Sequence, residues 1–167
     1  QLTTAEDVYV VTSKQIADAV RNQLPEVPEE NILAEPTGRN TAPCIAYAAA
    51  SISLKDPQAV MAIFPSDQLI SNENEFLRTV RFGIDSLKDH PELLITLGMI
   101  PDRPETGYGY ISPAEVVCSQ GGLALRRVSR FHEKPQRDKA LEYLEQGFLW
   151  NAGMFLWRVD TIMDEFR

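Results

Sequence analysis

Short apolar segments alternate with helix-length segments through the first half of the chain, and this order constrains the fold more than any other feature. The pattern predicts strands at residues 8–12, 31–34, 60–64 and 93–97, and helices at residues 14–23, 41–54 and 73–88. Strand, helix and strand in succession are typical of crossovers in a parallel sheet. The run at residues 60–64 has no polar alternation, which predicts burial on both faces. Ser13 is the expected N-cap of the first helix.

The second half of the chain has longer, partly exposed strands. The pattern predicts strands at residues 108–112, 123–131 and 153–159, and helices at residues 138–146 and 161–166. Gly121 and Gly122 favour a turn between the first two of these strands, and Gly147 favours the end of a helix. The predicted fold class is therefore α/β, with a mostly parallel sheet, extra antiparallel strands and a single domain over residues 1–167.

Composition limits the classes of ligand. The 167 residues carry a formal net charge of −8, which excludes a broad nucleic-acid surface because such a surface needs a basic face. No apolar run reaches the length of a membrane span, so no membrane contact is expected. Cys44 and Cys118 are expected to be reduced and buried in a cytoplasmic protein, with a disulfide as the alternative. His90 and His132 stand alone, which argues against a histidine metal site.

Three loops follow predicted strands, where ligands of an open α/β sheet bind. The first loop holds Glu35, Pro36, Gly38, Arg39, Asn40 and Thr41. Gly38 allows the backbone to approach a ligand closely. Asn40 or Thr41 can cap the following helix, whose N-terminus favours an anion or a ring carbonyl. Taken alone, a capped loop with a solvated arginine is the simpler interpretation.

The second loop begins with Ser66 and Asp67, directly after the predicted strand at residues 60–64. A carboxylate in that place is a natural ligand for Mg²⁺, which prefers oxygen ligands and substrate phosphates. The alternative is an aspartate that stabilises a turn or caps a helix.

The third loop contains Gly107, Tyr108 and Gly109. Two glycines around an aromatic residue can wrap a sugar, because backbone N–H groups reach its hydroxyls and the ring covers its apolar face. Glycine-rich hairpins have the same pattern, so this signal is weak in isolation.

The Phe-His-Glu-Lys-Pro segment at residues 131–135 places an acid beside a base at the end of a predicted strand. Pro135 ends the strand, so Glu133 and Lys134 can share one ligand instead of facing opposite sides of a sheet. A carboxylate accepts hydrogen bonds from sugar hydroxyls, and an ammonium binds phosphate. A surface ion pair is the alternative. Further along, Asn151 offers two donors and one acceptor to vicinal hydroxyls.

Taken in order, these motifs resemble those of the sugar-phosphate nucleotidylyltransferases. The matching stretches are Glu-Pro-Thr-Gly-Arg-Asn-Thr-Ala-Pro at residues 35–43, Phe-Pro-Ser-Asp at 64–67, Pro-Glu-Thr-Gly-Tyr-Gly-Tyr-Ile at 104–111, Phe-His-Glu-Lys-Pro at 131–135 and Trp-Asn-Ala-Gly-Met-Phe at 150–155. Motifs that recur in the family's order over nearly the whole chain are far more specific than any one of them. The Gly-Arg-Asn-Thr-Ala-Pro stretch points to the branch of the family that makes GDP-mannose.

The resemblance implies a Rossmann-like three-layer α/β/α nucleotide-diphospho-sugar transferase fold. It also implies the reaction of GTP with α-D-mannose 1-phosphate to give GDP-mannose and pyrophosphate. The implied nucleotide-binding residues are Glu35, Pro36, Gly38, Arg39, Asn40 and Ser66, and the implied sugar-binding residues are Gly107, Tyr108, Gly109, Glu133 and Asn151. Lys134 and Asp67 would be catalytic, with Asp67 holding Mg²⁺ at the nucleotide phosphates.

Further expectations follow from features of the family that the sequence does not contain. The family's glycine-rich triphosphate loop has no counterpart in the sequence, which predicts a fragment without that N-terminal loop, incomplete at the C-terminus as well, and weak or inactive by itself. The alternatives are a related hexose-1-phosphate nucleotidylyltransferase, a non-catalytic sugar-nucleotide-binding module and a purely structural domain. A cytoplasmic location is expected, and a homodimer is an open alternative for its assembly.

Overall fold

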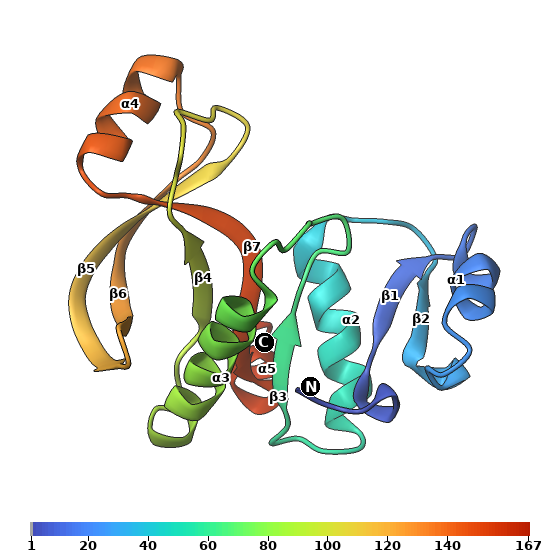
Figure 1. Ribbon diagram of the computed structural model, residues 1–167. Coiled ribbons are helices and arrows are strands. Elements are labelled where there is room, and N and C mark those ends of the chain that lie inside the picture. The colour runs from blue at the N-terminus through green and yellow to red at the C-terminus, as the bar shows by residue number, and fades with distance from the viewer. Residues whose placement is uncertain (1) are drawn as a thin grey trace. The chain divides into compact units, whose positions relative to one another are not determined.

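The computed structural model describes residues 2–167, which are drawn in Figure 1. These residues form two compact units. The first unit comprises the residues up to Met61 together with Arg158–Arg167, and the second comprises Ala62–Trp157. The division passes through strand β3 (Val60–Ile63) and the end of strand β7 (Leu149–Arg158). One family domain over residues 1–167 stays a prediction, and each unit is described by itself.

The first unit is built on two parallel strands. Its elements are η1 (Ala5–Asp7), β1 (Val10–Ser13), α1 (Ala17–Gln23), η2 (Glu29–Asn31), β2 (Ile32–Glu35), α2 (Thr41–Ser53) and α5 (Val159–Glu165). β1 and β2 pair in parallel, with Val10 opposite Ile32. Helices α1 and α2 pack on β2, and α2 also packs on α5. Ile32, Leu33, Ile45 and Ala49 are buried between these elements.

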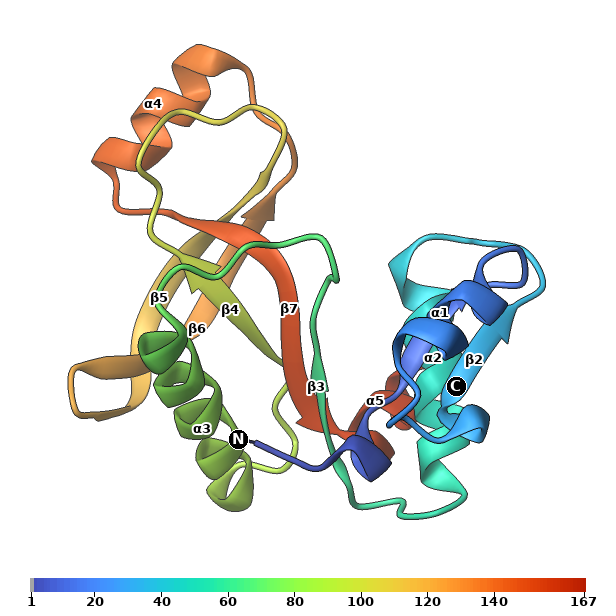
Figure 2. The ribbon, with the colours of Figure 1, turned by 45° about the vertical axis from the view of Figure 1, so that its right-hand side comes forward.

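The second unit is a mainly antiparallel sheet with two helices. Its further elements are α3 (Glu73–Asp89), β4 (Ile95–Met99), β5 (Gly109–Gln120), β6 (Leu123–His132) and α4 (Arg137–Glu145). The strand order is β3-β7-β5-β6, and β4 also pairs with β7. The β4–β7, β5–β6 and β5–β7 pairs are antiparallel, and β5 with β6 forms the long hairpin seen in Figures 1 and 2.

Two apolar clusters hold the second unit together. In the larger cluster, Val80 and Leu87 of α3 meet buried side chains of β4 and β7, and both views show α3 alongside these strands (Figure 2). Asn72 starts α3, because its side-chain oxygen accepts a hydrogen bond from the backbone N–H of Glu75 at 3.1 Å. The smaller cluster joins β5 to α4 through Tyr110, Ala140 and Tyr143.

The predicted α/β class, with parallel and antiparallel pairing, is confirmed. The predicted helix at residues 73–88 corresponds to α3, and the predicted turn at Gly121 and Gly122 joins β5 to β6. β5 extends to Gln120, well past the predicted end at residue 112, because β6 pairs with it along the hairpin. None of the helices in the described part of the chain combines the length and apolar character needed to span a membrane.

Three local predictions are wrong. Ser13 does not cap a helix, because β1 includes it and the backbone N–H of Lys14 still donates to Glu35 of the neighbouring strand. Asn40 occupies the N-cap position of α2, but its side chain makes no capping hydrogen bond. β3 is not buried on both faces: Met61 alone is buried among its four residues. β3 stands at the end of the strand order and therefore has a sheet partner on one side.

Candidate functional site

Gly109, Glu133 and Asn151 lie together in the second unit. The pairing of β5 with β7 sets Gly109 opposite Asn151. A Cβ atom at Gly109 would lie 3.0 Å from Oε2 of Glu133 and 3.6 Å from Cβ of Asn151. Any larger residue would therefore push on the Glu133 carboxylate. Three sequence motifs, separated widely along the chain, thus contribute to one small region, as the sequence predicts.

The turn after β6 carries the acid and the base. β6 ends at His132, so Glu133 and Lys134 are released from the alternation of the strand, as Pro135 predicts. The Lys134 Nζ lies 3.6 Å from Oε1 of Glu133, and both side chains are largely exposed. Lys134 has a φ of 39°, in the left-handed region that an L-residue rarely adopts. An exposed ion pair contributes little stability, so the turn keeps a strained residue without a folding benefit.

Asn151 is fixed by hydrogen bonds to its carbonyl oxygen. Its Oδ1 accepts from the backbone N–H of Gly153 at 3.1 Å, and the Thr96 hydroxyl shares its one proton between this oxygen at 3.4 Å and the carbonyl oxygen of Met154 at 3.3 Å. The acceptor expected for a ligand is therefore already engaged. The side-chain amide nitrogen remains as the group that can donate to a hydroxyl.

The loop that follows β3 is tied to the same strand. The side-chain amide of Gln68 donates to the carbonyl oxygen of Ala152 at 2.7 Å, and a Cβ at Gly153 would lie 3.6 Å from Cγ of Pro65. Asp67 is exposed, and its carboxylate makes no hydrogen bond or ion pair with any residue the structure describes. The loop therefore presents a free carboxylate beside the Asn151 strand.

The loop that precedes β5 is held by a network that the sequence did not reveal. The Glu105 carboxylate accepts from the backbone N–H of Gly107 at 2.9 Å, and this hydrogen bond holds the pKa of Glu105 below its usual value. Arg103 lies 3.4 Å from the same carboxylate, and its guanidinium stands 5.2 Å from the ring centre of Trp150. Tyr108 meets the same indole edge-on at 5.2 Å. The charged residues Asp102, Arg103 and Glu105, directly before the glycines, are the feature of the sequence that could have revealed this network.

The predicted nucleotide loop belongs to the first unit. Glu35 is the last residue of β2, and Pro36, Gly38, Arg39 and Asn40 are all exposed. Asn40 has a φ of 62° and a ψ of −165°, a conformation that is almost confined to glycine. Within residues 2–167, Asn40 and Lys134 are the two residues other than glycine with a positive φ. Backbone strain therefore occurs in two of the loops for which the sequence predicts ligands.

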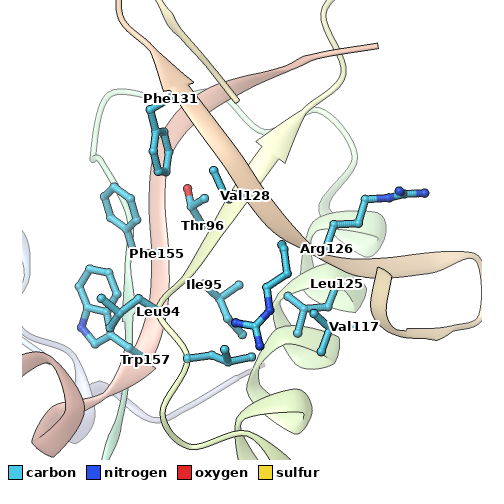
Figure 3. A pocket seen from close by; sticks show the side chains of 12 residues that line it. Leu94, Ile95, Thr96, Val117, Leu125, Arg126, Val128, Phe131, Phe155 and Trp157 are labelled. Atoms are coloured by element: carbon cyan, nitrogen blue, oxygen red, sulfur yellow. The ribbon is translucent and has the colours of Figure 1, made fainter. Parts of the chain in front are cut away.

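A groove of the second unit lies apart from these residues. Its volume is about 410 Å³, and Figure 3 shows apolar side chains from β4, β6 and β7 around it, including Ile95, Phe131 and Phe155. None of the predicted site residues lines this groove. Arg126 and Arg127 bring positive charge to the lining, but it includes no carboxylate that could accept from sugar hydroxyls or hold Mg²⁺, so this groove does not match the chemistry that the sequence motifs predict.

The family profile described as nucleotidyl transferase matches residues 2–166. The chain belongs to the nucleotidyl transferase family. The sequence prediction of this family is thereby confirmed.

Curated relatives of this nucleotidyl transferase chain indicate which branch of the family it resembles. Mannose-1-phosphate guanylyltransferase of Escherichia coli (strain K12) is 36% identical over 97% of this chain and 34% of its own length. Mannose-1-phosphate guanylyltransferase ManC of Salmonella typhimurium is 38% identical with the same coverage. The alginate biosynthesis protein AlgA of Pseudomonas syringae pv. tomato is 33% identical over 97% of this chain and 33% of its own. The chain spans about a third of the length of these relatives.

Solved structures share the fold of this nucleotidyl transferase chain. A protein of Thermus thermophilus, described as mannose-1-phosphate geranyltransferase, superimposes with a TM-score of 0.81 at 27% identity, over 94% of this chain and 44% of its own. A protein described as mannose-6-phosphate isomerase, from Helicobacter pylori, gives 0.74 at 28% identity, over 94% of this chain and 57% of its own. The predicted resemblance to the guanylyltransferase branch of the family is confirmed by the names of the curated relatives from Escherichia coli and Salmonella typhimurium.

Proposed function

We propose that the protein transfers a guanylyl group from GTP to α-D-mannose 1-phosphate, giving GDP-mannose and pyrophosphate. An oxygen of the sugar phosphate attacks the α-phosphorus of GTP, and the bond to pyrophosphate breaks as the new P–O bond forms. The observation that carries this proposal is the convergence of Gly109, Glu133 and Asn151 beside a strained Lys134. The names of the curated relatives supply the sugar and the base.

In this proposal the second unit binds the sugar phosphate. The Glu133 carboxylate accepts hydrogen bonds from sugar hydroxyls, while the Asn151 amide and the backbone N–H groups of the Gly107 to Gly109 loop donate to them. Tyr108 covers the apolar face of the sugar. The ammonium of Lys134 contacts the phosphate and offsets negative charge as two anions approach each other. Little covalent chemistry is required of the protein, because positioning and charge neutralisation lower the barrier.

The first unit would bind the nucleotide. Gly38 has open space where a side chain would be, and Glu35, Pro36, Arg39 and Asn40 flank it along the loop. The strained backbone of Asn40 supports a role for this loop in ligand contact. Ser66, next to Asp67, would complete the nucleotide contacts.

The residues fit Mg²⁺ as an ion that arrives with the nucleotide. Residues 2–167 contain no group of three histidine, cysteine or acidic side chains that could cage a metal. Asp67 offers one exposed, unpaired carboxylate, and Mg²⁺ typically uses one or two carboxylates together with substrate phosphates and water. Bound there, the ion would neutralise phosphate charge. Cys44 and Cys118 are free thiols and half-buried, so the prediction that both are buried is wrong.

The test measures GDP-mannose and pyrophosphate formed by the full-length protein from GTP and mannose 1-phosphate with Mg²⁺. GTP and mannose 1-phosphate are expected to be preferred over UTP and glucose 1-phosphate. Lys134→Ala is expected to lower kcat about 100-fold, because it removes a cation beside the developing charge. Lys88→Ala is the matched control: Lys88 is exposed on α3, pairs with Asp85, and its loss is expected to leave the rate unchanged.

Other outcomes would select other functions. A preference for another hexose 1-phosphate or another nucleotide would identify a related nucleotidylyltransferase. Calorimetric binding of GDP-mannose without turnover would identify a binding module. Undiminished GDP-mannose formation by Lys134→Ala would remove Lys134 from the mechanism.

A further inference from the structure

We propose that the hydroxyls of Tyr110 and Tyr143 form a buried brace that positions the two ligand-facing segments of the second unit. One segment is the loop at residues 105–109, and the other is the Glu133–Lys134 turn. The inference rests on the proposed function and adds two positioning residues to it. Neither tyrosine touches the substrate.

Each hydroxyl reaches one of the two segments. The Tyr110 hydroxyl donates to the backbone carbonyl of Glu105 at 2.9 Å, at the start of the sugar loop. The Tyr143 hydroxyl is hydrogen-bonded to Nδ1 of His132 at 3.0 Å, one residue before Glu133. The β5–β6 pairing sets Tyr110 directly opposite His132. The two hydroxyls, one from β5 and one from α4, therefore fix the two segments where Tyr110 and His132 lie side by side.

The body of the brace is rigid. Tyr110 is fully buried and Tyr143 is 8% exposed, and their ring centres lie 5.4 Å apart. Tyr143 stacks on Phe148 at 4.7 Å with an interplanar angle of 11°, and the His132 ring lies 4.7 Å from Tyr143. Aromatic rings packed in this way keep their orientation, so each hydroxyl is held in one direction.

Packing alone does not account for the hydroxyls. Phe148 fills its place in the same cluster without a polar atom. A buried hydroxyl must find a partner, and both tyrosines find theirs on the segments that carry the site. Within the turn itself, the ion pair is exposed and Lys134 is strained. A strained conformation persists when its surroundings fix it, and His132 is the neighbour that is anchored in the fold.

The experiment compares Tyr110→Phe and Tyr143→Phe with wild type in the full-length protein, measuring kcat and KM for mannose 1-phosphate. Tyr110→Phe is expected to raise KM about fivefold with little change in kcat, because its loop binds hydroxyls. Tyr143→Phe is expected to lower kcat about tenfold and to raise KM about twofold, because the turn carries both Lys134, which acts on the developing charge, and Glu133, which binds hydroxyls. Tyr47→Phe is the matched control, since its exposed hydroxyl has no partner among the described residues.

If the two tyrosines only stabilise the fold, both substitutions should lower the melting temperature. The two variants should then not differ in how they change kcat and KM. Wild-type values of both parameters in the folded variants would overturn the brace. If a tyrosine variant does not fold, His132→Asn and His132→Leu decide the case for the turn. Asparagine keeps an acceptor near the Nδ1 position and should retain kcat, whereas leucine should lose it; equal kcat values would refute the proposal. Absence of GDP-mannose formation by wild type would instead refute the proposed function, and the brace with it.

Discussion

At the scale of single residues, Lys134 and Asn40 hold backbone conformations that cost free energy. A side chain at positive φ brings Cβ close to a carbonyl oxygen, at a cost of about 1–2 kcal/mol. Both residues are exposed, so tight packing does not explain why the chain keeps them. Both lie in loops with ligand chemistry in the sequence. Strain therefore supports the assignment of these loops to the site.

Lys134→Gly is expected to be more stable than Lys134→Ala by about 1 kcal/mol, because glycine adopts a positive φ without steric cost. Both variants lose the ammonium, so both are expected to lose about 100-fold in kcat. Urea denaturation gives the free energies of unfolding, and steady-state kinetics gives kcat. Equal stability of the two variants would show that the turn is not strained.

His132 links the site to pH. Burial, followed by the nearby Arg130 and Lys139, holds the pKa of His132 below the ordinary value of 6.5. The unfolded chain therefore takes up this proton more readily than the folded chain, and this residue's contribution to stability falls as the pH drops below about 6.5. His132→Asn, which cannot titrate there, is expected to lose less melting temperature than wild type between about pH 7 and about pH 5. An identical pH dependence of melting would contradict this linkage.

At the scale of secondary structure, helix α3 shows where local signals suffice. Its apolar residues recur at helical spacing, and Asn72 supplies a cap, so the predicted and observed bounds differ by one residue at the C-terminus. The predicted start of the first helix at residue 14 is wrong. The backbone N–H of Lys14 donates to Glu35 of the neighbouring strand, and β1 runs through Ser13. A hydrogen bond between distant residues decided that boundary, and local sequence does not encode it.

Gly83 of α3 lies close against Leu156 of β7. A Cβ at Gly83 would collide with Cδ1 of Leu156, which is fully buried. Gly83→Ala is therefore expected to lower the free energy of unfolding by about 1–3 kcal/mol from overpacking, against a gain of about 1 kcal/mol in helix propensity. Asn74→Ala, exposed on the same helix, is the control and should be neutral or slightly stabilising. A more stable Gly83→Ala variant would show that Leu156 can move aside.

At the scale of the whole molecule, the charge of −8 must be reconciled with anionic substrates. Long-range attraction does not favour a nucleotide or a sugar phosphate on such a protein. Local cations are needed, and Lys134 and Mg²⁺ at Asp67 are the ones that the proposed site offers. The activity should therefore depend steeply on the Mg²⁺ concentration, whereas folding should not depend on it.

Removal of Mg²⁺ with EDTA is expected to abolish GDP-mannose formation and to leave the melting temperature unchanged, because the described residues include no caged metal site. Asp67→Asn is expected to raise the Mg²⁺ concentration for half-maximal rate about tenfold. Asp138→Asn, exposed at the start of α4, is the control and should leave the titration unchanged. A chelator-induced loss of structure would point to a structural metal instead.

The sequence by itself determined the family, the α/β class and the segments of the candidate site. It could do so because the periodicity of apolar residues and the order of short motifs are local properties of the chain. Only the tertiary structure decided that Gly109, Glu133 and Asn151 meet, and that the acceptor of Asn151 is already engaged. The Tyr110–Tyr143 brace and the Arg103–Trp150 contact likewise join residues far apart in the chain. Such contacts depend on strand register and side-chain packing, which form only when distant segments come together.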